Sequence, residues 1–302
     1  MFQSSRASAV DVTGRRSGRR HGPPACILRL RPLFWTFLAA PSGTRIMTEQ
    51  KWPQTIWVVR HGQSAGNVAR DAAELASAPL IDITVRDVDT PLSLLGEQQS
   101  DALGRWFARM PEYERPNVLL CSPYVRARAT AQRVLDAGGA SPDINTFFAD
   151  ERLREKEFGI LDRLTKFGIV AKYPELDEQR RHVGKFYFRP PGGESWCDVV
   201  LRLRSTLDTL VREHRSERVL IVAHQVIVNC MRYLLERMTE EQILAIDREG
   251  DVPNCSVTSY EFDPSQGRNG KLSLRLVNFV APLQEAGAPV TAEADVPAAP
   301  KP

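Results

Sequence analysis

The stretch VVRHGQSAGN, residues 58–67, decides how this chain is interpreted. Its first residues end a short run of apolar and β-branched side chains, which predicts a buried strand. Arg60, His61 and Gly62 follow at once. Because ligands of parallel α/β sheets bind at the carboxyl ends of the strands, we expect these three residues at a binding site.

The composition is that of an ordinary globular protein. The chain has 302 residues, of which 42% are hydrophobic and 25% charged, enough for one large domain or two small ones. The five cysteines are widely spaced and form no C-x-x-C pair, which favours a reducing, cytoplasmic compartment over disulfides or a zinc site. The most apolar run, residues 32–40, is far shorter than the roughly 18 residues of a membrane span, so no membrane partner is expected.

The net charge of +3 is unevenly distributed. Residues 1–46 contain eight arginines, no lysine, one aspartate and no glutamate, so they carry +7 and the remaining 256 residues carry −4. The basic character therefore belongs to the N-terminal segment, and nucleic-acid binding by the rest of the chain is not expected.

Residues 1–46 admit three interpretations. They fit a targeting segment, a basic interaction arm, or upstream sequence joined through a wrongly chosen start. Met47 opens a stretch that resembles a natural N-terminus running into a strand. We expect one catalytic domain over residues 47–283 and a disordered Pro/Ala-rich tail over residues 284–302.

Strand and helix signals alternate from Thr55 onward. Fully apolar strands between amphipathic helices predict an α/β fold, with a largely parallel sheet covered on both faces. Strands are expected at 55–59, 117–121 and 218–223, a late hairpin at 255–262 and 271–280, and helices at 93–110, 125–137 and 194–214.

Side chains suited to phosphate chemistry follow the expected strands or lie in the irregular region after residue 150. Guanidinium groups match phosphate oxygens, and a histidine can attack phosphorus. A second histidine can stabilise developing charge, and a carboxylic acid can protonate the departing oxygen. If the strands are neighbours, one pocket for metal-free phosphoryl transfer through a phosphohistidine would contain Arg60, His61, Arg126, Glu155 and His224.

Each residue of this set, taken singly, also has an ordinary explanation. A histidine at a strand end is usually a satisfied polar residue, and Arg126 alone could be a solvated helix residue. The joint placement favours a site, because four separate stretches offer side chains suited to one anion. Gly62 fits this interpretation, since a side chain there could block the approach of substrate. His182 and His214 lie in charged surroundings typical of a surface.

A cysteine phosphatase loop is excluded. The stretch CSPYVR, residues 121–126, has four residues between cysteine and arginine and no glycine, where that loop needs five residues with glycine among them. Cys121 ends an apolar strand and is predicted to be a buried thiol.

Six segments, in order, resemble the histidine phosphatase superfamily, also called phosphoglycerate mutase-like. They lie between about Thr55 and Val280 and read VVRHGQSAGN, PLSLLGEQQSDALG, CSPYVRARATA, LREKEFG, PPGGESWCDVVLRL and VLIVAHQ. The resemblance implies a three-layer α/β/α sandwich and catalysis without a metal or other cofactor. It implies that His61 is the phosphorylated nucleophile and that Glu155 is the general acid. The implied phosphate contacts are Arg60, Arg126, His224 and Asn67.

Within this superfamily the chain most resembles fructose-2,6-bisphosphatase domains. A basic aromatic run before PPGGES and the His-Gln pair after the strand carry the likeness, which implies substrate contacts from Lys185, Arg189 and Gln225. Two positions depart from the pattern, because Tyr187 and Asn229 stand where arginines are expected. That loss matters for a second phosphate, which needs positive charge. No P-loop motif occurs, so a kinase partner domain is not expected.

Three functions remain open at this point. The first is a phosphomonoesterase that acts on a small phosphorylated metabolite, possible examples being sugar phosphates. The second is a phosphoglycerate mutase, disfavoured because Lys156 and Glu157 replace the residues that follow the acid in cofactor-dependent mutases. The third is a non-catalytic phospho-ligand binding module, which would not need the acid at Glu155. The oligomeric state is not predicted.

Overall fold

A computed structural model of the chain describes residues 50–293. The N-terminal segment 1–46, with its three interpretations, lies outside the described residues, as do residues 294–302 of the expected tail.

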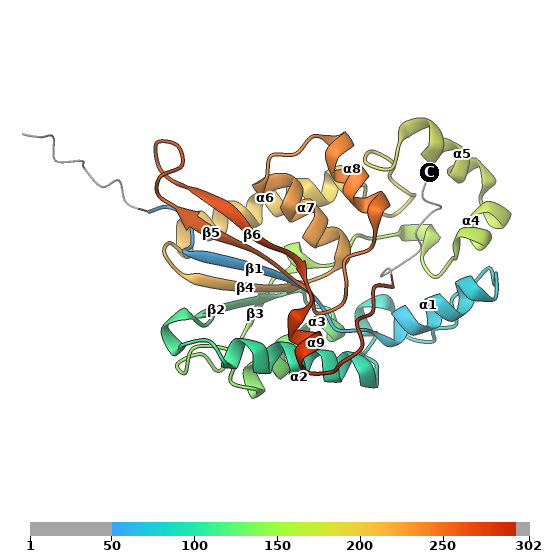
Figure 1. The fold of residues 1–302 in the computed structure, drawn as a ribbon. Helices are drawn as coiled ribbons and strands as arrows, with labels where there is room; N and C mark the ends of the chain where they lie inside the picture. Colours follow the sequence, from blue (N-terminus) through green and yellow to red (C-terminus); the bar gives the residue numbers. More distant parts are fainter. Residues whose placement is uncertain (1–49, 294–302) are drawn as a thin grey trace, which may run out of the picture. The chain divides into compact units, whose positions relative to one another are not determined.

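One mixed sheet of six strands forms the centre of the described part (Figure 1). The strand order is β3–β2–β4–β1–β5–β6, in which the first four strands are parallel and β5 runs antiparallel to both of its neighbours. The expected strands and the late hairpin are confirmed. The strands are β1 (Thr55–Arg60), β2 (Val118–Cys121), β3 (Phe148–Ala149), β4 (Arg218–Ala223), β5 (Val257–Asp263) and β6 (Lys271–Phe279).

Helices cover both faces of this sheet. Helices α2, α3 and α9 lie on one face and α6 and α7 on the other (Figure 1), which confirms the three-layer α/β/α architecture. The helices are α1 (Ala65–Leu75), α2 (Leu94–Ala108), α3 (Val125–Asp136), α4 (Lys166–Lys172), α5 (Pro174–Val183), α6 (Trp196–Glu213), α7 (Gln225–Leu235), α8 (Glu240–Glu249) and α9 (Ala281–Glu285).

The apolar character of β1 follows from this two-sided cover. Ile56 and Val58 pack into the cluster under α6 and α7, whereas Trp57 and Val59 pack into the cluster under α2 and α3. Successive strand side chains point to opposite faces, so a strand covered on both sides has no position for a polar residue. Burial of each such side chain stabilises the fold by about 1.5–3 kcal/mol.

The register of the parallel strands brings their carboxyl ends to one edge. Arg60 of β1 pairs with Ala223 of β4, and Cys121 of β2 pairs with Val222. The residues that follow these three strands are His61, Ser122 and His224, and they are therefore neighbours although they are far apart in sequence.

The packed domain continues past the expected boundary at residue 283. Leu283 in α9 is fully buried against α2 and α3, and the Asn254 amide donates to the Thr291 carbonyl oxygen at 2.8 Å. Residues 284–293 thus differ from the disorder expected for the tail. The Pro/Ala-rich composition concealed this order, because contacts with residues distant in sequence anchor the segment.

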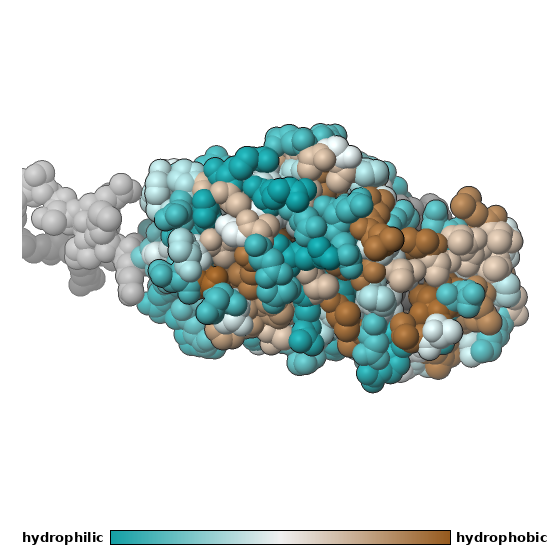
Figure 2. Space-filling model, turned by 90° about the horizontal axis from the view of Figure 1, so that it is seen from below, coloured by the Kyte–Doolittle hydropathy of each residue, from teal (hydrophilic) through white to brown (hydrophobic). Residues whose placement is uncertain are grey.

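The face of the molecule drawn in Figure 2 carries both polar and apolar residues. Figure 2 shows hydrophobic residues gathered at the end of the molecule where Figure 1 places α1. Exposed apolar side chains on α1 and in the loop after it are Val68, Leu75, Leu80 and Val85. No helix among residues 50–293 combines the length and apolar character that a membrane crossing requires.

Candidate active site

His61 lies fully buried directly after β1, and its two ring nitrogens have different partners. Nδ1 is 2.6 Å from the carbonyl oxygen of Gly62, and Nε2 is 3.2 Å from Nε of Arg126. A carbonyl oxygen only accepts and a guanidinium only donates, so this network assigns the proton to Nδ1 and leaves a lone pair on Nε2. Nε2 is therefore the ring nitrogen that carries the lone pair, which accepts from Arg126 here.

Arg126, in the first turn of α3, is held by groups from three directions. Its Nη1 donates to the Asp87 carbonyl oxygen at 2.6 Å and lies 3.0 Å from the Asp87 carboxylate. Its guanidinium carbon lies 4.9 Å from the ring centre of Tyr124. A guanidinium that is 1% exposed needs a charge partner, and Asp87 supplies it. Because Asp87 and Tyr124 hold the guanidinium, the Nε–H of Arg126 points to His61.

His224 follows β4 and faces the same pocket. Its Nε2 lies 2.7 Å from the Ser122 hydroxyl oxygen. Its ring centre is 5.1 Å from that of His61 and 5.0 Å from that of Tyr124. The structure thus brings together both histidines and Arg126 at the carboxyl ends of β1, β2 and β4.

Arg60 is fully buried behind His61, against the end of the described chain. Its Nη1 donates to the Val252 carbonyl oxygen at 2.5 Å, and its Nη2 donates to the Glu293 carbonyl oxygen. Asn67 Nδ2 donates to that same oxygen at 3.4 Å, and Gln63 Nε2 donates to the Glu293 carboxylate at 3.0 Å. The C-terminal segment therefore brings a carbonyl group and a carboxylate next to the predicted phosphate contacts.

Glu155 lies in the loop after β3, and its side chain is buried. Its Oε1 accepts from the Lys156 amide at 2.7 Å, while its backbone carbonyl accepts from Arg202 at 3.2 Å. Arg202 also binds Glu194 at 3.0 Å. The PPGGES segment and α6 thereby fix the loop that carries the predicted acid.

Three cations lie close to this loop, and one of them, Lys185, is a predicted substrate contact. Lys156 sits 4.2 Å from the ring centre of Phe158, and burial lowers its pKa to about 8. Lys185 is paired with Asp247, and burial lowers its pKa although Asp247 opposes the shift. Burial also lowers the pKa of Arg180. All three act electrostatically on one another and form a cluster of cations beside Glu155, called the positive region below, whose charge Asp177 and Asp247 partly offset.

The other two predicted substrate contacts have different surroundings. Gln225, at the start of α7, donates to Asp251 at 2.6 Å, and Asp251 acts electrostatically on Lys185. Arg189 is 63% exposed and binds Asp198 at the start of α6, at 2.7 Å. The structure therefore brings Gln225 toward the positive region and leaves Arg189 outside it.

Close packing of the loop after β1 against α2 requires glycine at position 62. A Cβ atom there would lie 2.3 Å from the Gly96 carbonyl oxygen and 2.7 Å from the Ser100 hydroxyl oxygen. The Gly62 amide already donates to Thr130 at 3.1 Å. The glycine therefore allows the site loop to pack against α2, and its expected second purpose, to make room for substrate, stays a prediction.

Four residues that hold the site are not among the predicted site residues: Asp87, Ser122, Asn254 and Glu293. Asn254 donates to the His61 carbonyl oxygen at 3.0 Å and so anchors the backbone of the predicted nucleophile. Of these four, only Ser122 could have been proposed from the sequence, because it directly follows a predicted strand.

Comparison with known families identifies the chain. The histidine phosphatase superfamily (branch 1) matches residues 56–274. The chain belongs to this superfamily, as the six ordered segments indicated, and it is an enzyme of the histidine phosphatase class.

Two curated relatives represent different activities. A 6-phosphofructo-2-kinase/fructose-2,6-bisphosphatase of Caenorhabditis elegans is 32% identical over 191 residues, which is 63% of this chain and 36% of that protein. A 2,3-bisphosphoglycerate-dependent phosphoglycerate mutase of Sinorhizobium fredii is 32% identical over 204 residues, which is 66% of this chain and 87% of the mutase. The match thus spans about a third of the first relative and most of the second.

Solved structures share the fold. A mycobacterial glucosyl-3-phosphoglycerate phosphatase has a TM-score of 0.56 at 23% identity, over 76% of this chain and 99% of that one. The alpha-ribazole phosphatase of Shigella flexneri has a TM-score of 0.58 at 20% identity, over 75% of this chain and 96% of that one. At these identities the likeness establishes the architecture alone.

The contact between Gly62 and α2 predicts a large stability difference between two glycine substitutions. Gly62→Ala is expected to lower the free energy of unfolding by about 2–3 kcal/mol, because the new methyl group meets a backbone oxygen. Gly250→Ala is the matched control, since that glycine has extended backbone and no atom near an added Cβ. It should change stability by less than about 0.5 kcal/mol. Urea denaturation measures both, and equal effects would contradict the packing argument.

The buried Lys156 predicts a stability change that depends on pH. Its pKa falls from 10.5 to about 8 on folding, so between these values the unfolded chain holds a proton that the folded chain has lost. Stability from this group therefore rises with pH in that window. Lys156→Met should stabilise the protein at neutral pH, and this gain should shrink by about 1 kcal/mol per pH unit above roughly pH 8.

Denaturation at a series of pH values measures this gain. Lys172→Met, at an exposed position, is the control for removing a lysine from the surface. A constant gain for Lys156→Met would refute the lowered pKa.

Proposed function

We propose that this protein is a phosphomonoesterase that hydrolyses a small phosphorylated metabolite through a phosphohistidine on His61, without a metal ion. One observation carries the proposal. Nδ1 of His61 is hydrogen-bonded to the carbonyl oxygen of the next residue, Gly62, and Nε2 faces the Nε–H of Arg126. A phosphoryl group bound by Arg126 would therefore lie next to the lone pair that attacks it.

In the first step, the Nε2 lone pair of His61 attacks phosphorus and the bond to the leaving oxygen breaks. Glu155 gives its proton to that oxygen, so an alcohol departs. Arg126 and His224 donate to the non-bridging oxygens as their charge increases. Arg60 adds positive charge behind the nucleophile.

In the second step, water attacks the phosphohistidine. The Glu155 carboxylate takes a proton from this water, and the bond between phosphorus and Nε2 breaks. Inorganic phosphate leaves, and His61 regains its lone pair. Each group ends in its starting state, so the reaction consumes only the phosphate ester and water.

The proposed substrate carries a second anionic group. The positive region beside Glu155 consists of Lys156, Arg180 and Lys185. Gln225 donates to Asp251, which acts electrostatically on Lys185 of that region. These cations would take the place of the arginines that Tyr187 and Asn229 replace. A phosphorylated sugar or sugar acid with a carboxylate or a further phosphate fits this arrangement.

A phosphoglycerate mutase is the second candidate, because the mutase of Sinorhizobium fredii matches along 87% of its length. The first step would be the same. The phosphoryl group would then return from His61 to a hydroxyl of an organic acceptor and would not pass to water.

We expect the enzyme to act in the cytoplasm, on a small molecule and without a nucleic-acid or membrane partner. The cysteines of the described part, Cys121, Cys197, Cys230 and Cys255, are all free thiols, and burial raises the pKa of Cys121 to about 12. Unpaired thiols favour a reducing compartment.

The first test is release of inorganic phosphate from sugar phosphates, phosphoglycerates and p-nitrophenyl phosphate, in EDTA. His61→Ala is expected to lower kcat/KM by at least about 10³-fold, because the nucleophile is lost. His182→Ala, which changes an exposed histidine on α5, should leave it unchanged. Turnover that survives in His61→Ala would refute the hydrolase proposal, and isomerisation of phosphoglycerate without phosphate release would select the mutase.

The second test separates the general acid from a structural role. Glu155→Gln should lower kcat by about 10²–10⁴-fold for an alkyl phosphate, whose leaving oxygen needs a proton. The loss should be much smaller for p-nitrophenyl phosphate, since its leaving group departs as an anion. The control is Glu151→Gln at an exposed position of the same loop. Equal losses on both substrates would show that Glu155 acts by position alone.

A further inference from the structure

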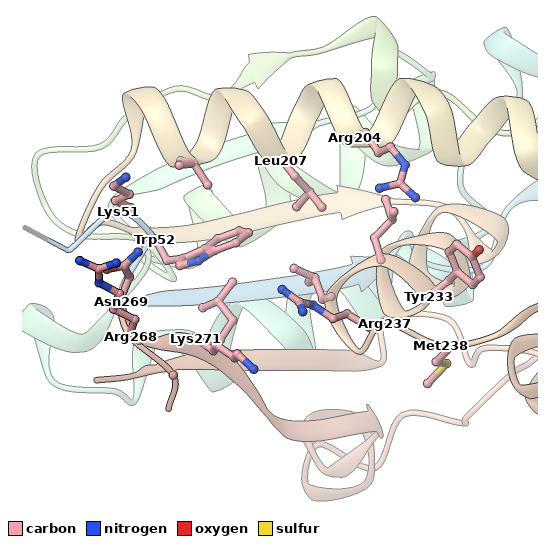
Figure 3. Close-up of a pocket in the computed structure, with 16 residues that line it drawn as sticks. Lys51, Trp52, Arg204, Leu207, Tyr233, Arg237, Met238, Arg268, Asn269 and Lys271 are labelled. Carbon is pink, nitrogen blue, oxygen red and sulfur yellow. The ribbon is translucent and has the colours of Figure 1, made fainter. Parts of the chain in front are cut away.

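A groove lies at the other end of the sheet from the candidate active site, between α6, the turn after α7 and the β5–β6 hairpin (Figure 3). Trp52 lines it and precedes β1, whereas His61 follows β1. A strand of this length separates the two by roughly 20 Å. The groove has a volume of about 780 Å³, in the range of about 300–1,000 Å³ that small-molecule sites occupy.

The groove concentrates positive charge, although the 256 residues after residue 46 together carry a net charge of −4. Among residues 50–293, no aspartate or glutamate lines it. The cations that line it are Lys51, Arg204, Arg237, Arg268 and Lys271. Opposite charge on a ligand is the complement of such a surface, and low-dielectric walls strengthen the attraction.

Nearby carboxylates do not neutralise these cations within residues 50–293. Glu236, which precedes Arg237, accepts from Arg232 at 2.9 Å and from Tyr260 at 2.8 Å. Asp263, in the hairpin, accepts from the Ser265 hydroxyl at 2.6 Å. In the described part of the chain, none of the five cations of the groove forms an ion pair.

Arg237 occupies a backbone position that favours glycine. Its φ is 55°, directly after the C-terminal end of α7, and the next amide, of Met238, donates to the Tyr233 carbonyl oxygen at 3.1 Å. Helices commonly end in this way with glycine in the left-handed position, because a side chain there costs energy. Figure 3 shows Arg237 and Arg204 reaching into the same groove from opposite sides. A strained residue that presents a guanidinium to a groove suggests function.

The floor of the groove is apolar. Leu207 of α6 and Leu272 of β6 line it, and Figure 3 shows the Trp52 ring beside Leu207. A partly exposed indole offers a face on which a flat aromatic ring can stack. The groove thus combines a stacking surface with three planar guanidinium groups suited to phosphate oxygens.

We propose that this groove binds a nucleoside polyphosphate, with the base on Trp52 and the phosphates among Arg204, Arg237 and Lys271. The positive charge of the groove, its aromatic floor and its volume all match a nucleoside polyphosphate. The site lies outside the proposed phosphohydrolase chemistry and would hold its ligand without turnover.

Isothermal titration of the full chain in the His61→Ala background, in EDTA, tests the proposal. The probes are ATP, inorganic tripolyphosphate and adenosine. ATP is expected to bind with a stoichiometry of one, tripolyphosphate at least about tenfold more weakly, and adenosine more weakly still, because each lacks one half of the recognition. Equal affinity for ATP and tripolyphosphate, or no ATP binding, would overturn the proposal.

Arg237→Gly is the informative variant, because glycine suits the left-handed position and the fold should be retained. We expect an unchanged or raised Tm and an ATP Kd raised at least about tenfold. Arg204→Gln should raise the Kd similarly, and the exposed Arg248→Gln on α8 should not change it. In the otherwise native enzyme, Arg237→Gly should leave phosphate release unaltered.

Orthovanadate, which mimics phosphate, distinguishes the groove from the candidate active site. ATP affinity should be the same with and without saturating vanadate. Displacement of ATP by vanadate, or an ATP Kd unaffected by Arg237→Gly and Arg204→Gln, would assign the binding to the active site and refute the groove.

Discussion

The parallel pairing of β1 with β4 is the constraint on which the site depends. Its register sets Arg60 opposite Ala223, so the next residues, His61 and His224, emerge from the sheet side by side. The apolar strands maintain this register because both faces are buried, and a slip by one residue would turn every side chain to the wrong face. Two histidines 5.1 Å apart between ring centres are thus a consequence of how the core packs.

Buried charge is the second constraint, and it explains why the site contains the partners that hold its arginines. Arg60 and Arg126 are almost fully buried, so each needs partners within the protein. Asp87 holds Arg126 so that its Nε–H meets His61, and two backbone carbonyls hold Arg60. The Nε–H of Arg126, together with the Gly62 carbonyl oxygen on the other ring nitrogen, also assigns the tautomer of His61.

The end of the described chain belongs to this arrangement. Glu293 contacts Arg60, Asn67 and Gln63, and the segment before it is tied to the loop that carries Asn254. The phosphate contacts predicted from sequence therefore have a carbonyl and a carboxylate beside them. The basic groove at the opposite end of the sheet is separate from this network, and its cations have no such partners within residues 50–293.

The sequence by itself determined the fold class, every strand except β3 and the superfamily, because apolar runs record burial and the six segments record chemistry locally. It could not reveal Asp87 or Glu293, since their contacts with Arg126 and Arg60 join positions 39 and 233 residues apart. The tertiary structure also decided why residue 62 is glycine, that residues 284–293 are packed, and that Arg189 binds Asp198 away from the positive region. Such features depend on which distant segments meet, and no local pattern of hydrophobicity or charge encodes that meeting.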